Sequence, residues 1–311
     1  DTKTVGLKAL IKIAGLQKTI LAYHVAFCLA PRLNAAGRIG NAEEALELLL
    51  TDDTCKADII AQKLDATNQT RKEIEEKAKQ EALTELYSSF DETKDFGLVV
   101  GKHGWHPGIV GIVASRLVKI FARPVVVIAF NDNGAGQGSC RSIEGYNIIQ
   151  ALERCKEYLL NFGGHKKAAG ITLLRENFDR FRLKFNEVVG SELKDSDLRP
   201  VQHINSWIKL SEVDMSLLNG LNKLRPFGQD NPRPVFAIRQ THIADVPRKV
   251  GGNHLRFTVE SDGKRASAIA FNMANSTIPQ GPVDIAFYLQ KNTYSGNNDL
   301  QLNIQDIRQA Q

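Results

Sequence analysis

The spacing of hydrophobic residues changes along the chain and divides its first ninety residues into two helical stretches. Over residues 6–50, apolar side chains recur at helical spacing. We expect Pro31 to stop a helix there, residues 32–38 to be irregular, and Asn41 to cap a further short helix. Residues 54–90 contain no Gly or Pro and have sparse apolar positions, which predicts one long helix connecting two domains.

The second half of the chain changes from a mixed pattern to an alternating one. Short Val- and Ile-rich runs alternate with helical segments over residues 91–190, which predicts a compact α/β domain. A polar linker follows. The apolar period then becomes two, as at Leu255 and Phe257, and several short strands over residues 198–311 favour an all-β barrel of the OB-fold type. The predicted fold class is therefore α/β plus all-β.

Composition and charge limit the class of protein without naming a function. The 311 residues are 42% hydrophobic and 24% charged, as in an ordinary globular protein, and no apolar run has the length of a membrane span. The net charge of +5 permits binding to a polyanion but does not establish it. The four cysteines show no metal-ligand spacing, and we expect a reducing cytoplasm. Because the chain begins with Asp1, we expect it to be part of a longer protein.

A glycine-rich segment over residues 161–170 is the first candidate site. Gly163 and Gly164 are followed directly by His165 and Lys166. Glycines let a backbone approach a bulky ligand, and exposed amides beside basic side chains suit phosphate. A tight turn whose His and Lys merely face water is an equally good interpretation.

The second candidate lies between Gly136 and Ser142. Glycines, two hydroxyls and one Arg could form a pocket for a terminal phosphate, because a guanidinium can bind two phosphate oxygens at once. In a strand, Ser139 and Arg141 would project to the same side. Taken alone, a glycine-rich hairpin with a surface Arg is the simpler interpretation.

Two further segments place polar residues beside predicted helices. Arg32, Asn34 and Arg38 flank a run of small residues after Pro31, although nearby acidic residues offer an ordinary ion-pair explanation. His106 follows a Trp at a predicted helix start, a setting that attracts anions or stacks a base, although the Trp could simply anchor the loop.

A proline-rich segment over residues 224–234 precedes the predicted barrel strands. It is too rich in proline to be regular. It could offer Arg and Phe side chains to a nucleic-acid strand at the barrel rim. We favour the alternative, in which Phe227 plugs one end of the barrel.

Residues for a metal centre are missing from the sequence pattern. There is no D-x-D at a predicted strand end and no D-H-H, and the seven His are scattered. A two-metal hydrolase needs several carboxylate or His ligands that converge on the ions. We therefore expect this chain to hold no metal.

The segments taken in order resemble the RecJ family of the DHH phosphoesterase superfamily. The resemblance covers nearly the whole chain, and the ordered set is more specific than any one motif. The segments that carry it are residues 31–38, 64–72, 105–116, 138–142, 162–170 and 226–232.

The resemblance implies a 5′-to-3′ exonuclease on single-stranded DNA that uses Mn²⁺ or Mg²⁺ and acts in DNA repair and recombination. The metal ligands of that family lie in an N-terminal DHH domain, and no position here corresponds to them. The implied domains are a C-terminal remnant of the DHH domain (1–53), a connecting helix (54–90), a DHH-associated substrate-binding domain (91–190) and an OB-fold (198–311). We expect this chain alone to be inactive as a nuclease.

The resemblance also implies roles for particular residues. Ser139 and Arg141, with Ser142, would hold the 5′-phosphate, and the glycine-rich segment with His165 would face the absent metals. Arg38 would support catalysis from the helical part. Cys140 stands where the resemblance leads us to expect Gly, which adds bulk within the expected phosphate pocket.

We also expect particular binding partners for the whole protein. Besides single-stranded DNA, we expect a single-strand-binding protein and a helicase as partners, no membrane contact, and a monomer. Two alternatives remain open. One is another DHH-family oligonucleotide phosphodiesterase, and the other is a non-catalytic nucleic-acid-binding or partner-docking module.

Overall fold

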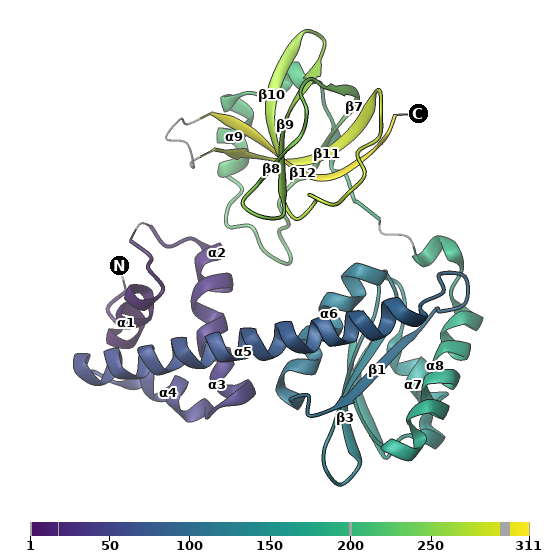
Figure 1. Cartoon of the computed structure of the whole chain (residues 1–311). Coiled ribbons are helices and arrows are strands. Elements are labelled where there is room, and N and C mark those ends of the chain that lie inside the picture. Colours follow the sequence, from purple (N-terminus) through teal and green to yellow (C-terminus); the bar gives the residue numbers. More distant parts are fainter. Residues whose placement is uncertain (1, 18, 199–200, 293–298, 311) are drawn as a thin grey trace. The chain divides into compact units, whose positions relative to one another are not determined.

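The computed structural model describes residues 2–17, 19–198, 201–292 and 299–310. Contacts divide the chain into two compact units, Asp1–Pro200 and Val201–Gln311, each with its own core (Figure 1). Within the described residues, no helix is both long and apolar enough to cross a membrane.

Short helices at the start of the chain pack on the first half of one long helix (Figure 1). They bury a common core that includes Leu10, Leu48 and Leu64. The helices are α1 (Val5–Ile13), α2 (Ala22–His24), a π-helical turn (Val25–Leu29), α3 (Ala30–Ile39), α4 (Ala42–Leu50) and the long α5 (Thr54–Ser89).

The irregular segment expected after Pro31 is instead a helix, so that prediction is wrong. Pro31 does not stop the helix as predicted: the π-helical turn Val25–Leu29 runs directly into α3, and this irregular turn lies where the proline would disturb α-helical hydrogen bonds. Ala36 belongs to the helical core and Ala35 is buried as well, and this packing favours the helix.

Helix α5 has the length and the connecting role that the sequence predicted. The Asp53 side chain caps its start by accepting a hydrogen bond from the Lys56 amide. Its first half joins the helical core, and its second half packs Ala78 and Ala82 onto the α/β domain.

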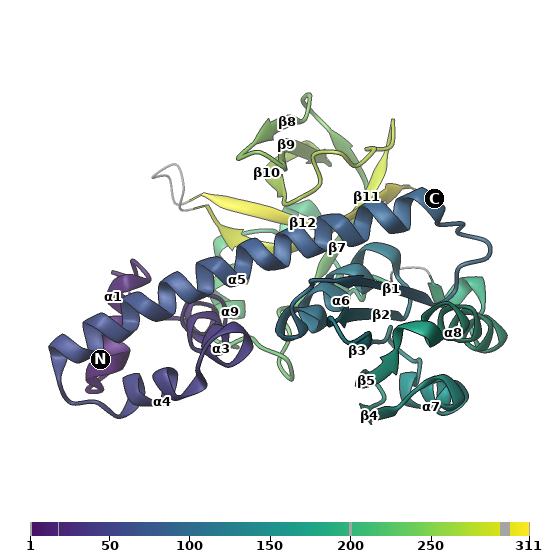
Figure 2. The same ribbon diagram turned by 60° about the horizontal axis from the view of Figure 1, so that its bottom comes forward.

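The α/β domain is built on a five-stranded sheet in the order β1-β2-β3-β5-β4 (Figure 2). Strands β1 (Leu98–His103) and β2 (Val125–Phe130) are parallel and are joined by α6 (Pro107–Phe121). Helices α5 and α6 cover one face of the sheet, and α7 (Ile148–Glu153) and α8 (Phe178–Glu192) cover the other. The remaining strands are antiparallel: β3 (Ala135–Arg141), β4 (Asn161–His165) and β5 (Ala168–Leu174).

The glycine-rich segment is a hairpin and not the loop we expected. Gly163 and Gly164 lie within edge strand β4, and only Lys166 and Lys167 form the turn to β5. Glycine-rich sequence has low strand propensity, but the pairing with β5 and the contact of α7 with β4 override it.

The second unit is a closed five-stranded barrel with OB-fold topology, as predicted. Its ring runs β7-β9-β10-β12-β11 and back to β7, and the β10–β12 pair is parallel. Two short strands, β6 and β8, pair at its margins. The strands are β6 (Ser206–Trp207), β7 (Phe236–Ile243), β8 (Arg248–Val250), β9 (His254–Ser261), β10 (Lys264–Ala270), β11 (Val283–Lys291) and β12 (Leu300–Gln309).

Helix α9 (Met215–Asn222), and not Phe227, packs against the barrel core. Leu218 of this helix is buried in the core cluster, whereas Phe227 is half-buried and lies outside it. The Asn231 side chain donates hydrogen bonds to the carbonyls of Leu224 and Pro226, which closes the proline-rich segment on itself. The prediction that Phe227 plugs the barrel is therefore wrong.

Candidate nucleic-acid interface

One face of β3, β5 and β4 is left open beyond the edge of α6, and we call it the open floor. Helix α6 packs against β2 and β3, whereas most positions of β4 and β5 on this face are exposed. Side chains that share a face in neighbouring strands form rows across the sheet. The three rows of the floor are Gln137–Thr172–Asn161, Ser139–Gly170–Gly163 and Arg141–Ala168–His165.

The Arg141 side chain lies between the open floor and α6. Its Nε donates to Ser115 Oγ at 3.1 Å, and its Nη1 donates to Ser139 Oγ at 2.7 Å and to the Cys140 carbonyl at 2.8 Å. Ser139 and Arg141 therefore project to the same side of the strand, as predicted. These contacts fix the guanidinium without neutralising it, because all three acceptors are uncharged.

Arg38, at the end of α3, contacts the start of α6, the helix whose Ser115 holds Arg141. Its Nη1 donates to the Gly108 carbonyl at the start of α6, at 3.1 Å. Burial lowers the pKa of Arg141, and the charge of Arg38 acts in the same direction. An arginine keeps its charge at neutral pH even so. Within the described part of the chain neither guanidinium forms an ion pair, so this pair of charges suits an anion such as phosphate.

We call the surroundings of the Arg141 guanidinium the anion pocket. Two residues that border it, Gly111 and Ser115, were not predicted as site residues from the sequence. Gly111 lies in α6 where an added Cβ would come within 2.9 Å of Arg141 Nη2 and 3.0 Å of Ser139 Oγ. Ser115 lies one turn further along, and its hydroxyl also donates to the Gly111 carbonyl at 2.9 Å. A glycine in a helix interior is the signal that could have pointed to this close approach.

The edge of the open floor carries the Gly-Gly-His residues. Gly164 has a φ of 149°, and a Cβ there would lie 2.5 Å from the Ala168 carbonyl oxygen, so the backbone itself requires glycine. Gly163, His165 and Lys166 are exposed. The structure therefore brings His165 into one row with Arg141, with Ala168 between them.

Two other predicted residues have structural partners. The Ser142 hydroxyl donates to the Tyr146 carbonyl at 2.8 Å, which stabilises the turn after β3. Arg32 donates to the Asp65 carboxylate at 2.7 Å and is mostly buried. The ion pair foreseen as the ordinary explanation for Arg32 thus exists, with a partner on α5.

The last two predicted residues lie at the start of α6 and on α3. His106 caps α6, where its Nδ1 accepts from the Gly108 amide at 3.0 Å. Asn34 is exposed on α3. The Trp that precedes His106 is buried, and its indole donates to Glu81 at 2.8 Å, as expected for a Trp that anchors the loop.

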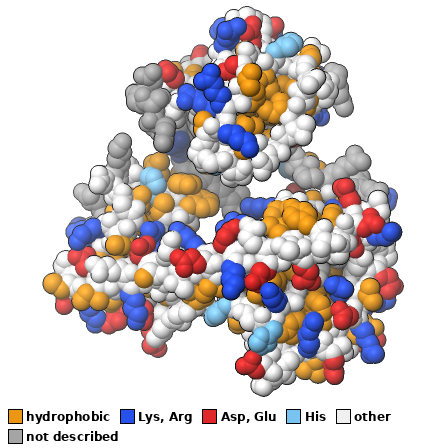
Figure 3. All heavy atoms as spheres, viewed as in Figure 1, with side chains coloured by type: hydrophobic (Ala, Val, Ile, Leu, Met, Phe, Trp, Pro, Cys, Tyr) orange, Lys and Arg blue, Asp and Glu red, His pale blue; other side chains and the backbone are white. Residues whose placement is uncertain are grey.

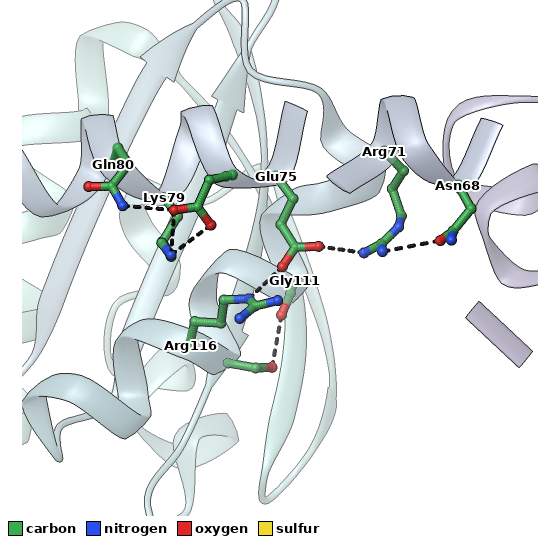
Figure 4. A network of polar contacts seen from close by, with 9 residues as sticks. Asn68, Arg71, Glu75, Lys79, Gln80, Gly111 and Arg116 are labelled. Atoms are coloured by element: carbon green, nitrogen blue, oxygen red, sulfur yellow. Dashed lines mark hydrogen bonds and ion pairs between the residues drawn. The ribbon is translucent and has the colours of Figure 1, made fainter. Parts of the chain in front are cut away.

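A buried carboxylate joins α5 to α6 behind the anion pocket (Figure 4). Glu75 is 3% exposed and accepts from Arg71 of its own helix and from Arg116 of α6. Arg71 also donates to Asn68 Oδ1 at 3.2 Å. Since Arg116 follows Ser115 directly, this network fixes the part of α6 that holds Arg141.

The barrel carries a separate basic surface on β8 and β9. Arg248 is directly opposite Arg256 across the two strands, and both are exposed. Like charges in register repel, and neither residue has an acidic partner among the described residues. Basic side chains lie beside an apolar area on the barrel face seen in Figure 3. Nearby, Phe271 is 43% exposed and contacts the His254 ring, as an aromatic platform for a base would.

The described residues provide no ligand set for a metal centre. Over the ranges that the structure describes, no three His, Cys, Asp or Glu side chains come together as ligands. A two-metal site needs more ligands than this, so no reaction step is assigned to a metal on this chain.

Comparison with known proteins identifies both domains. Residues 94–191 match the DHHA1 domain model, and residues 204–306 match the RecJ OB domain model. The single-stranded-DNA-specific exonuclease RecJ of Bacillus subtilis is 34% identical over 98% of this chain and 39% of its own length. The Escherichia coli RecJ is 36% identical over 97% of this chain and 54% of its own length.

A solved structure agrees over the full chain. The crystal structure of RecJ from Thermus thermophilus in complex with Mn²⁺ superposes with a TM-score of 0.84 at 29% identity, covering 100% of this chain and 45% of that one. The chain thus spans about half the length of the relatives it matches. The chain belongs to the RecJ family, of which it carries the DHHA1 domain and the OB domain.

Proposed function

We propose that this chain is the substrate-gripping part of a 5′-to-3′ single-stranded-DNA exonuclease. The observation that carries the proposal is the Arg141 guanidinium, which Ser115 and Ser139 hold beside the open floor and which has no carboxylate partner among the described residues. A phosphate can accept hydrogen bonds from guanidinium and hydroxyl groups together. The relatives reported above are single-stranded-DNA-specific exonucleases, which supports the choice of substrate.

The proposal gives each predicted group a role. Ser139 and Arg141 hold the 5′-phosphate, and Arg38 supports them from α3. The single-stranded DNA passes along the edge of the sheet, beside Gly163, Gly164, His165 and Lys166. We also assign a supporting role along this path to Ser142, Arg32, Asn34 and His106, with Ser142 and Arg32 acting through the turn and the ion pair that they form.

We assign roles to the domains of the chain and to the rest of the enzyme as well. Residues 1–53 are the remnant of a DHH domain, 54–90 the connecting helix, 91–190 the substrate-binding domain and 198–311 a second DNA-binding domain. The Mn²⁺ or Mg²⁺ belongs to a part of the enzyme outside this chain. The enzyme acts as a cytoplasmic monomer in repair and recombination, together with a single-strand-binding protein and a helicase.

A digestion assay tests whether this chain binds DNA without cutting it. The chain is incubated with 5′-phosphorylated single-stranded DNA and Mn²⁺, and we expect binding without cutting. Cutting that a chelator abolishes would overturn the claim that this chain is inactive alone.

A substitution tests the grip itself. Arg141→Ala should weaken binding of the phosphorylated strand roughly 10- to 100-fold, since a hydrogen bond to a charged group contributes about 1.5–3 kcal/mol. The matched control is Arg154→Ala, because Arg154 forms an ion pair with Glu192 in the same unit. Equal affinities of the two variants would contradict the proposal.

A further inference from the structure

The row Gln137–Thr172–Asn161 on the open floor has no role in the site described so far. It borders a shallow cavity of about 410 Å³ that is open to solvent. Gly163, Gly170 and Ile171 also line the cavity. No side-chain hydrogen bond to a described residue occupies Gln137, Thr172 or Asn161.

The cavity lies one nucleoside away from the anion pocket. Gln137 and Ser139 are two residues apart on β3, which places their rows about 7 Å apart. The Arg141 guanidinium is hydrogen-bonded to Ser139, so the anion pocket is at the Ser139 row. A nucleoside whose phosphate lies there would extend over Gly170 towards Thr172.

The two glycines of the Ser139 row leave room that the protein itself does not use. A Cβ at Gly163 would meet no atom within 4 Å, and a Cβ at Gly170 would meet only the Gly138 carbonyl oxygen at 3.9 Å. Neither residue has a positive φ. The fold would therefore accept a larger residue at either position, and the space above them suits a ligand.

We propose that Gln137, Thr172 and Asn161 receive the base of the 5′-terminal nucleotide. This inference rests on the proposed function, which places the 5′-phosphate at Ser139 and Arg141. Carboxamide and hydroxyl groups each offer a donor and an acceptor, so the row can satisfy the edge of any base. Recognition of this kind holds the terminal nucleotide without selecting its sequence.

The test measures binding of 5′-phosphorylated single strands that differ only in whether the terminal nucleotide carries a base. We expect the unaltered chain to bind the abasic strand roughly tenfold more weakly, as the loss of one or two hydrogen bonds predicts. The double variant Gln137→Ala/Asn161→Ala should bind both strands equally and should keep its preference for a 5′-phosphate over a 5′-hydroxyl. Gln150→Ala, an exposed amide on α7, is the matched control and should behave as the unaltered chain.

The outcomes separate this inference from the proposed function. Both amides are exposed, so the variants should keep the melting temperature of the unaltered chain. The inference is overturned if the unaltered chain binds the abasic strand as tightly as the strand with the base. It is also overturned if the double variant discriminates between the two strands as strongly as the Gln150→Ala control does. A missing 5′-phosphate preference in the unaltered chain overturns the proposed function, and this inference with it.

Discussion

Replacing Gly111 with Ala separates the stability of the fold from the binding of phosphate. The added Cβ would lie 2.9 Å from Arg141 Nη2 and 3.0 Å from Ser139 Oγ, so the guanidinium has to move. Both atoms are ends of side chains, and the movement costs the fold little. A Gly→Ala change inside a helix stabilises it by about 0.5–1 kcal/mol. We therefore expect an unchanged or slightly raised melting temperature.

Binding should change in the opposite direction. Displacing the guanidinium removes a charge-assisted contact of about 1.5–3 kcal/mol, which corresponds to roughly 10- to 100-fold weaker binding of a 5′-phosphorylated strand. Fluorescence anisotropy at low salt measures this affinity. Gly220→Ala is the control, because it makes the same change in α9, where a Cβ meets nothing within 4 Å. A Gly111→Ala variant that binds the phosphorylated strand as tightly as this control would refute the reasoning.

Three further predictions concern the ion network, the barrel and one half-buried acid. Glu75→Gln should destabilise the fold by about 3–5 kcal/mol in chemical denaturation, because it removes the counter-charge of a buried pair. The exposed Glu76→Gln control should cost less than about 1 kcal/mol, and equal losses would contradict the account. Arg256→Ala should lower the salt dependence of single-strand binding by about 0.7 in the log–log slope, whereas Arg265→Ala, whose guanidinium is paired with Glu260, should change it less. Burial raises the pKa of Glu85 in the folded protein above its value in the unfolded chain. The stability that the protonated carboxyl contributes is therefore fully present below the unfolded pKa, and it is lost as the pH rises through the folded pKa. Glu85→Gln should therefore raise the melting temperature at pH 7 and not at pH 4, and a gain of equal size at both would contradict this cause.

Local patterns predicted most of the architecture. The 36 residues of α5 contain no Gly or Pro, and this uninterrupted stretch predicted the long helix. Alternation on β9 and β12 predicted the barrel, because one face of each strand must be buried. The pairing of Ser139 with Arg141 also followed from strand geometry alone.

What the sequence did not reveal depends on contacts between distant residues. Arg32 forms an ion pair with Asp65, which is 33 residues away in the sequence, and Glu75 forms one with Arg116, which is 41 residues away. The role of Gly111 depends on how closely β3 approaches α6, which no local pattern encodes. The helix after Pro31 was missed for a related reason, since burial of its alanines and not its propensity decides the conformation.

The central claim is that this chain grips the 5′-phosphate of a single strand. The most direct test compares the dissociation constants of the unaltered chain for one single-stranded oligonucleotide with a 5′-phosphate and with a 5′-hydroxyl, at one fixed low salt concentration. We predict at least roughly tenfold tighter binding of the phosphorylated strand, as one charge-assisted contact provides. Equal dissociation constants for the two strands would contradict the claim.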